Sequence, residues 1–338
     1  MIKRNFCAII PAFNEEKVIS SSLCSLKKIF GAKDIYVVSD GSTDKTVSLA
    51  KCAGVNVLGL RKNGGKALAQ EKVIKKFKLT KRYKYVLFSD ADSQLDPEFL
   101  NAAKVYFPKL PALIVGTVKS EKKGLISAFR AYEYGLSHRI FKNAQNLISV
   151  ITVAPGCASF YNSSVLEKLC LKSPTLTEDF DLTIQIHQKN LGKIIYASKA
   201  IVITQDPSSF RDYWKQVLRW NIGTWQNYFL YKLYKPNSKY NVELNFLFLD
   251  NFLWVASIII ALSFPATLIN ILIGMILTIY SSALIVSFLE KKCWIILYIP
   301  VFPIFLFINI ASYFYAIFKV VSSPRRRTKL TWNKVARY

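Results

Sequence analysis

The chain has 338 residues, of which 52% are hydrophobic, and a formal net charge of +25. This length suffices for one sizeable domain and an additional segment. Six scattered cysteines without a CxxC pair, and only two histidines, argue against a zinc site and against a disulfide framework. The basic excess suits nucleic acid, anionic lipid or an anionic substrate, but no nucleic-acid-binding signature is found, so we expect no nucleic acid partner.

Strands alternate with helices in the first part of the chain, which predicts an open, mostly parallel α/β sheet. The expected strands are 6–14, 34–38, 55–60 and 84–88, and the expected helices are 15–30 and 64–77. The chain opens on a strand and not on an apolar signal segment, so we expect about the first 235 residues to stay in the cytosol. Ligands of such sheets bind beyond the carboxyl ends of the strands.

Polar residues follow the second strand at that end. Asp40 precedes Gly41, which suits a tight turn, and Asp44 lies four residues on. Carboxylates here could accept hydrogen bonds from a ribose hydroxyl or a base N–H. An ordinary Asp-Gly turn explains the same residues without a ligand.

A pair of glycines comes before the second predicted helix. Gly64 and Gly65 precede Lys66, an early helix residue. Free helix amides and a lysine could bind a phosphate, although the spacing is not that of a P-loop. The alternative is a helix start with a surface lysine.

Two aspartates directly follow the last of these strands. Asp90 and Asp92 flank one alanine, and alternate residues of an extended segment point the same way. Adjacent carboxylates repel unless a cation joins them, and Mg²⁺ or Mn²⁺ bridging to a diphosphate would fit. The alternative is a solvated acidic loop.

A third acidic group opens the helix expected in LTEDFDLTIQIHQKN, residues 176–190. Thr177 is expected to cap this helix, because its side-chain oxygen can accept from the first free amides. The helix dipole alone favours Glu178, Asp179 and Asp181 in the first turn. The apolar residues expected to face a core are Phe180, Leu182, Ile184 and Ile186.

An aromatic, amphipathic helix is expected near 209–234, and such a helix can lie among lipid headgroups. Its apolar and aromatic residues include Tyr213, Trp214, Val217, Leu218 and Trp220. Gln216, Arg219 and Trp220 in KQVLRW remain available to a substrate.

The stretch 244–318 has Asp250, Glu290, Lys291 and Lys292 as its only charged residues. It divides into apolar segments at 244–264, 266–289 and 294–318, each long enough to cross a bilayer, which takes about 20 helical residues. Three such runs in succession favour a membrane region over buried core helices.

A basic tail at 319–338 suits anionic headgroups. Its basic residues include Arg325, Arg326, Arg327, Lys329, Lys334 and Arg337. Three spans after a cytosolic domain would place this tail outside, whereas the positive-inside rule places it inside. One segment could fail to span, through the Pro300 and Pro303 break or through Asp250 at the interface, or the rule could fail here; the sequence leaves these alternatives open.

The motifs DGSTD, NGGKA, DAD, TEDFDL and QVLRW, in this order and followed by membrane segments, resemble the family-2 glycosyltransferases that work at membranes. The resemblance covers residues 6–227, and the pattern is nearest to poly-N-acetylglucosamine, hyaluronan and cellulose synthases. It implies a GT-A nucleotide-binding α/β domain over residues 1–235, a helical membrane region over 244–318, and inversion at the transferred sugar.

The resemblance also implies roles for single residues. Asp40 resembles the aspartate that contacts the nucleoside, usually of UDP, and Lys66 the lysine near the nucleotide. Asp90 and Asp92 match the DxD motif, with Asp92 as the metal contact for Mg²⁺ or Mn²⁺. Asp179 matches the general base, which Glu178 could orient. The set that matches QxxRW, near the diphosphate and the acceptor, is Gln216, Arg219 and Trp220.

The expected activity is therefore transfer of a sugar from a nucleotide-sugar, with UDP expected, to a lipid-linked or growing glycan acceptor at the cytosolic membrane face. The few apolar segments favour a lipid or short lipid-linked acceptor over a long polymer, unless the protein forms a homo-oligomer. Asn162, which ends GCASFYN, stands where relatives often have a basic residue. The alternatives are a processive synthase and a protein that only binds nucleotide-sugars.

Overall fold

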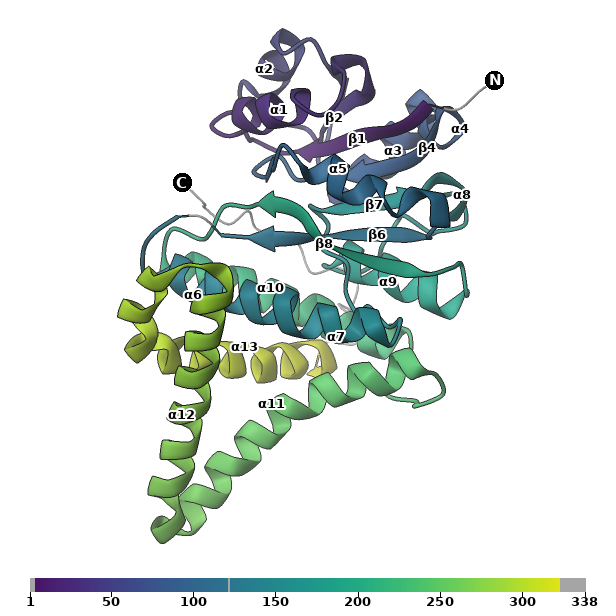
Figure 1. Ribbon diagram of the computed structural model, residues 1–338. Helices are drawn as coiled ribbons and strands as arrows, with labels where there is room; N and C mark the ends of the chain where they lie inside the picture. Colours follow the sequence, from purple (N-terminus) through teal and green to yellow (C-terminus); the bar gives the residue numbers. More distant parts are fainter. Residues whose placement is uncertain (1–3, 121, 323–338) are drawn as a thin grey trace. The chain divides into compact units, whose positions relative to one another are not determined.

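The computed structural model describes residues 4–120 and 122–322, without the side chains of residues 258, 261, 262 and 265–267 (Figure 1). The chain forms two compact units. The first comprises Met1–Lys119 and Asn143–Gln205, and the second comprises Ser120–Lys142 and Asp206–Tyr338. The predicted basic tail lies, from residue 323 onward, outside the described residues.

The described part of the first unit is built on an eight-stranded sheet in the order β3-β2-β1-β4-β7-β6-β8-β5. The strands are β1 (Arg4–Ala12), β2 (Ile35–Ser39), β3 (Asn56–Gly59), β4 (Tyr83–Phe88), β5 (Gln94–Leu95), β6 (Leu113–Lys119), β7 (Ser159–Asn162) and β8 (Ile194–Ile203). The four strands expected from the sequence, β1 to β4, pair in parallel as predicted. The rest is mixed, because β7 runs antiparallel to β4 and β6, and β5 antiparallel to β8.

Helices pack on both faces of this sheet. They are α1 (Ile19–Lys27), α2 (Thr46–Cys52), α3 (Lys66–Phe77), α4 (Leu79–Arg82), α5 (Phe99–Lys104), α7 (Lys142–Leu147), α8 (Ser163–Leu166) and α9 (Glu178–Gln188), with short 3-10 turns η1 (Ala32–Asp34) and η2 (Phe107–Lys109). Neighbouring residues of a strand point to opposite faces. Tyr161 of β7 joins a buried core with α3 and α9, whereas Phe160 stacks on Phe99 of α5 at 5.7 Å between ring centroids.

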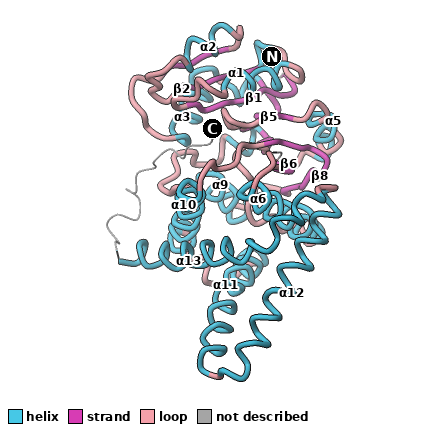
Figure 2. Tube along the Cα trace, turned by 90° about the vertical axis from the view of Figure 1, so that its left-hand side faces the viewer, coloured by secondary structure: helices cyan, strands magenta, loops and turns pink. Residues whose placement is uncertain are grey.

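The second unit is helical in its described part (Figure 2). Its elements are α6 (Leu125–Gly135), a π-helical segment η3 (Leu136–Phe141), α10 (Phe210–Leu230), α11 (Lys239–Ser263), α12 (Pro265–Glu290), a 3-10 segment η4 (Cys293–Val301) and α13 (Phe302–Ser322). The helix expected near 209–234 is α10. One core joins α6, α10, α12, η4 and α13, with Phe129, Tyr213 and Phe305 among its buried residues.

Two helical stretches within the described residues are long and apolar enough to cross a membrane, by length and composition: Leu268–Glu290 and Cys293–Ser322. They match the second and third predicted segments. The first predicted segment, 244–264, forms most of α11, which is not one of these two stretches. The Pro300 and Pro303 break falls at the junction of η4 and α13. The most apolar part of each stretch is mostly exposed, with 22% buried in the first and 28% in the second. Exposed apolar helices of this length are consistent with a membrane region.

All six cysteines are free.

Candidate active site

Lys66 joins two of the predicted acidic motifs. It is the first residue of α3, which the chain enters through Gly65 at a φ of 90°. Its Nζ lies 2.6 Å from Oδ1 of Asp90, after β4, and 2.9 Å from Oε1 of Glu178, at the start of α9. Three motifs that are far apart in the sequence are therefore brought together by one ammonium group.

The surroundings of Lys66 keep this ammonium charged. Burial by itself lowers the pKa of Lys66, but the carboxylates of Asp90, Glu178 and Asp179 outweigh burial and raise the pKa above its ordinary value. A permanent positive charge therefore lies among three carboxylates. Such a charge can offset their mutual repulsion and attract an anionic ligand.

Asp179, the predicted base, is held by backbone amides. Its Oδ2 accepts a hydrogen bond from the Gly156 N–H at 3.1 Å, and its Oδ1 accepts one from the Phe180 N–H at 2.9 Å. Gly156 packs closely here, since a Cβ on it would lie 2.9 Å from Nζ of Lys66 and 3.5 Å from Asp179. These bonds hold both oxygens of the carboxylate in place, as a general base requires.

The start of α9 differs in part from the prediction. Thr177 is the N-cap residue, as predicted, but its side chain makes no capping hydrogen bond, so that part of the prediction was wrong. Glu178 pairs with Lys66, and Asp181 is buried and accepts from the Gln185 side chain at 3.1 Å. The apolar residues of this helix are buried as predicted.

Asp40 organises the loop that leads into α3. It is buried, and its two oxygens accept hydrogen bonds from the N–H groups of Gly64 at 2.9 Å and Gly65 at 2.7 Å. Gly41 has a φ of 76°, and a Cβ there would lie 2.7 Å from the backbone nitrogen of Asn63, so only glycine suits this turn. The predicted contact between Asp40 and a nucleoside stays a prediction.

Asp44 has a local role. Its carboxylate accepts from the Glu16 N–H at 3.0 Å and from the Thr46 N–H and hydroxyl at the start of α2.

Asp90 and Asp92 are the predicted ligands for a divalent cation. Within the described residues, no group of three or more His, Cys, Asp or Glu side chains could hold a metal ion. Asp90 and Asp92 nevertheless place carboxylate oxygens in one short loop after β4, and both side chains are partly exposed. Mg²⁺ is commonly bound by one or two carboxylates together with substrate phosphates. These residues therefore fit a cation that arrives with a diphosphate.

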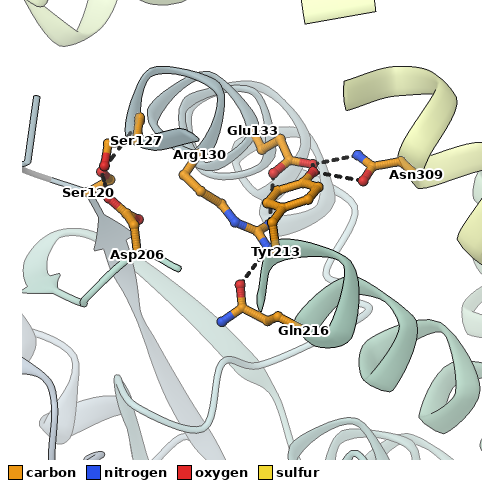
Figure 3. Close-up of polar contacts among 8 residues, drawn as sticks. All are labelled: Ser120, Ser127, Arg130, Glu133, Asp206, Tyr213, Gln216 and Asn309. Atoms are coloured by element: carbon orange, nitrogen blue, oxygen red, sulfur yellow. Dashed lines mark hydrogen bonds and ion pairs between the residues drawn. The ribbon is translucent and has the colours of Figure 1, made fainter. Parts of the chain in front are cut away.

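The QVLRW residues lie on α10 in the second unit. Gln216 is buried, and its Oε1 accepts a hydrogen bond from Nη2 of Arg130 on α6 at 2.5 Å (Figure 3). The guanidinium of Arg130 also lies over the ring of Trp220, 4.8 Å from its centroid. Arg219 lies between Gln216 and Trp220 in the sequence and is partly exposed.

Sequence reasoning missed two residues that the structure brings to these motifs. Gly156 lies in GCASFYN, a motif that was interpreted only through its last residue, Asn162, which caps α8. Arg130 lies in a helix for which the sequence offered no chemical motif. An arginine on an otherwise apolar helix face was the only available signal.

Comparison with known families decides the class of protein. The family described as "Glycosyltransferase like family 2" matches residues 4–223 of the chain. The chain belongs to the family-2 glycosyltransferases. This match confirms the resemblance read from the five motifs.

Similar curated proteins include poly-beta-1,6-N-acetyl-D-glucosamine synthases from Staphylococcus epidermidis and Staphylococcus aureus. Each is 25% identical over 224 residues, which are 64% of this chain and 53% of the relative. The chain thus spans about half the length of these relatives.

Among solved structures, a mannosyltransferase from Pyrobaculum calidifontis in complex with GDP-Man and Mn²⁺ is similar to this family-2 glycosyltransferase. It has 16% sequence identity and a TM-score of 0.53, and the match covers 71% of this chain and 67% of that chain. At this identity the likeness concerns the fold, and it agrees with the predicted GT-A domain.

Proposed function

We propose that this family-2 glycosyltransferase inverts the sugar that it transfers, with Asp179 as the general base. The acceptor hydroxyl gives its proton to the Asp179 carboxylate while its oxygen attacks the anomeric carbon. The bond between that carbon and the diphosphate oxygen breaks, and the nucleoside diphosphate leaves with the bonding electrons. The donor is a nucleotide-sugar, for which we expect a UDP-sugar.

The observation that carries this proposal is the polar cluster at the start of α9. Asp179 is held by two backbone N–H groups and has the Lys66 ammonium among its neighbours. Both features hold the carboxylate in one position beside a positive charge. A carboxylate that served only the helix dipole would not need amides from another loop, such as that of Gly156.

Charge on the leaving diphosphate needs stabilisation from positive groups. Lys66 is such a group in the first unit, and we propose that Asp90 and Asp92 hold Mg²⁺ or Mn²⁺ with the donor, Asp92 being the main ligand. The cation, when bound, supplies positive charge to the diphosphate oxygens. From the family pattern, we propose that Gln216, Arg219 and Trp220 contribute to diphosphate and acceptor binding.

We propose that the protein is an integral membrane protein with its catalytic domain in the cytoplasm. Large apolar side chains along α12 are exposed, among them Leu277 at 62% and Phe288 at 82%. Apolar surface of this extent is unfavourable in water and suits a bilayer. A cytosolic face agrees with cytosolic nucleotide-sugars and with six free cysteines.

The acceptor is proposed to be a lipid or a lipid-linked glycan. Polymer synthesis, by an oligomer of this chain, is the second candidate, because the similar curated proteins are named polysaccharide synthases. The two candidates differ in the product, so that one assay separates them.

The experiment uses membranes that contain the full chain and a panel of labelled UDP-sugars with Mg²⁺ or Mn²⁺. The products are divided between organic solvent and a high-molecular-weight fraction. Label in the organic phase supports the lipid acceptor, and label in the polymer fraction supports the second candidate. Absence of label above an Asp179→Asn control in both fractions, with GDP-sugars included, would contradict the proposed transfer.

The same membranes test the cation. We expect a chelator to abolish transfer and added Mg²⁺ or Mn²⁺ to restore it, and we expect Asp92→Ala to raise the cation concentration that is needed. Transfer that is indifferent to chelators would exclude a metal role for Asp92.

A further inference from the structure

Arg130 of α6 is a buried charge in the second unit, with only 2% of its surface exposed. Its Nη1 donates to Oε2 of Glu133 at 2.7 Å, and its Nη2 donates to Oε1 of Gln216 at 2.5 Å. The guanidinium lies 4.5 Å from the ring centroid of Tyr213 and 4.8 Å from that of Trp220. Figure 3 shows this side chain directed from α6 towards α10.

The residues that Arg130 contacts on α10 form one stripe. Tyr213, Gln216 and Trp220 are spaced by three and four residues, and therefore share one face of the helix. Arg130 binds the first and last of them through their ring faces and the middle one through its amide oxygen. One planar group thus sets the side-chain conformations of two motif residues.

A second layer of polar residues holds the arginine. Asn309 of α13 donates from Nδ2 to Oε1 of Glu133 at 2.7 Å, and its Oδ1 accepts from the Tyr213 hydroxyl at 2.7 Å. These two bonds fix the orientation of the Asn309 amide. They also pair the polar side chain of Asn309, on the apolar helix α13, with Glu133 and Tyr213. An unpaired polar group in such surroundings would be costly.

Stability alone is a poor reason for this arrangement. A buried ion pair is often no more stable than apolar residues of similar size, because both charges lose their hydration. Burial lowers the pKa of Arg130, but Glu133 together with other neighbouring groups outweighs burial and raises the pKa, so the group stays charged. A charged, planar fork gives a defined geometry that leucine or lysine cannot reproduce.

We propose that Arg130 is a positioning residue for the QVLRW motif: it acts through Gln216 and Trp220, and Glu133 and Asn309 hold it in place. This inference rests on the proposed function, since it requires that the motif serve the transfer reaction. Arg130, Glu133 and Asn309 lie outside the five sequence motifs that carry the family resemblance.

The first test is Arg130→Lys, which keeps the charge and removes the planar fork. We expect kcat/KM for transfer to fall by about tenfold or more, with a higher KM for the acceptor. The matched control is Arg139→Lys, because Arg139 also forms an ion pair, with Glu290 at 2.5 Å, in the same unit. The control should stay within about twofold of the wild type.

A double-mutant cycle separates positioning from general support. Because Arg130 is proposed to act through Gln216, adding Arg130→Lys to Gln216→Ala should cost much less than it costs in the wild type. Additive losses in this cycle would overturn the proposed route. Near-wild-type kinetics of Arg130→Lys would overturn the inference as a whole.

A spectroscopic readout does not depend on activity. Arg130→Lys should change the near-ultraviolet circular dichroism of tryptophan, and this change should vanish in a Trp220→Phe background. If Arg130→Lys does not fold, Asn309→Leu gives the milder test, with a smaller loss of the same kind expected. A wild-type protein that transfers no sugar would refute the proposed function, whereas an active wild type with an indifferent Arg130→Lys would refute only this inference.

Discussion

At the scale of single residues, charge is concentrated around Lys66. One ammonium contacts Asp90 and Glu178, and Asp179 is near enough to raise its pKa. An incoming diphosphate would add negative charge to this cluster of three carboxylates. Lys66 is therefore the residue whose position decides whether these carboxylates can lie together, and a displacement of its ammonium should affect the reaction more than folding.

Gly156→Ala tests this position. The added Cβ would lie 2.9 Å from Nζ of Lys66, and a flexible side chain can move away without disturbing the backbone. We expect transfer to fall by up to about 10²-fold, because small displacements of catalytic groups are costly. The thermal midpoint should stay close to that of the wild type.

The control for that variant is Gly59→Ala, since a Cβ on Gly59 would meet nothing within 4 Å. Equal activity of Gly156→Ala and Gly59→Ala would show that the packing of Gly156 against Lys66 does not affect sugar transfer.

At the scale of elements, α9 carries a buried histidine whose protonation affects the stability of the fold. It carries Glu178 and Asp179 at its start and His187 near its end, where Nε2 lies 2.9 Å from the carbonyl oxygen of Ile151. Burial lowers the pKa of His187 below its ordinary value, and the Ile151 carbonyl offsets this only in part. The folded state therefore binds its proton less readily than the unfolded chain does.

The sign of the effect follows from this lowered pKa. The stabilising contribution of His187 is complete above the unfolded pKa of about 6.5, and it is lost as the pH falls through the folded value. In His187→Gln the amide can still donate to Ile151 but cannot titrate. Thermal midpoints between pH 8 and pH 5 should therefore fall less steeply in the variant; parallel curves would contradict the assignment.

Elements also show what the sequence could predict and what it could not. β1 to β4, α3 and α9 follow from local apolar patterns, and the polar residues after β2 and β4 and at the starts of α3 and α9 were predicted as candidate sites. The antiparallel pairing of β7 with β4 and β6 depends on contacts far apart in the sequence, which no local pattern contains. The same reason explains why Gly156 and Arg130 were missed, since each matters only through a distant partner.

At the scale of the whole molecule, membrane insertion is the property most open to test. The full chain should remain in the membrane fraction after washing with high salt or alkaline carbonate, and detergent should extract it. Leu277→Arg should reduce insertion, because an arginine near the middle of a span costs about 2.5–3.5 kcal/mol.

Val105→Arg is the matched control for insertion, since Val105 is 64% exposed on the first unit. Release of the wild-type chain by carbonate, or equal insertion of Leu277→Arg and Val105→Arg, would contradict the membrane region.

The measurement that tests the central claim most directly compares donor binding and sugar transfer in Asp179→Asn. Asparagine keeps an oxygen for the Gly156 N–H but cannot serve as a base. We predict donor affinity within about threefold of the wild type and transfer lowered by about 10²–10⁴-fold, the usual contribution of a general base. Asp181→Asn, two residues further along the same helix, should transfer normally. Near-normal turnover in Asp179→Asn would contradict the account.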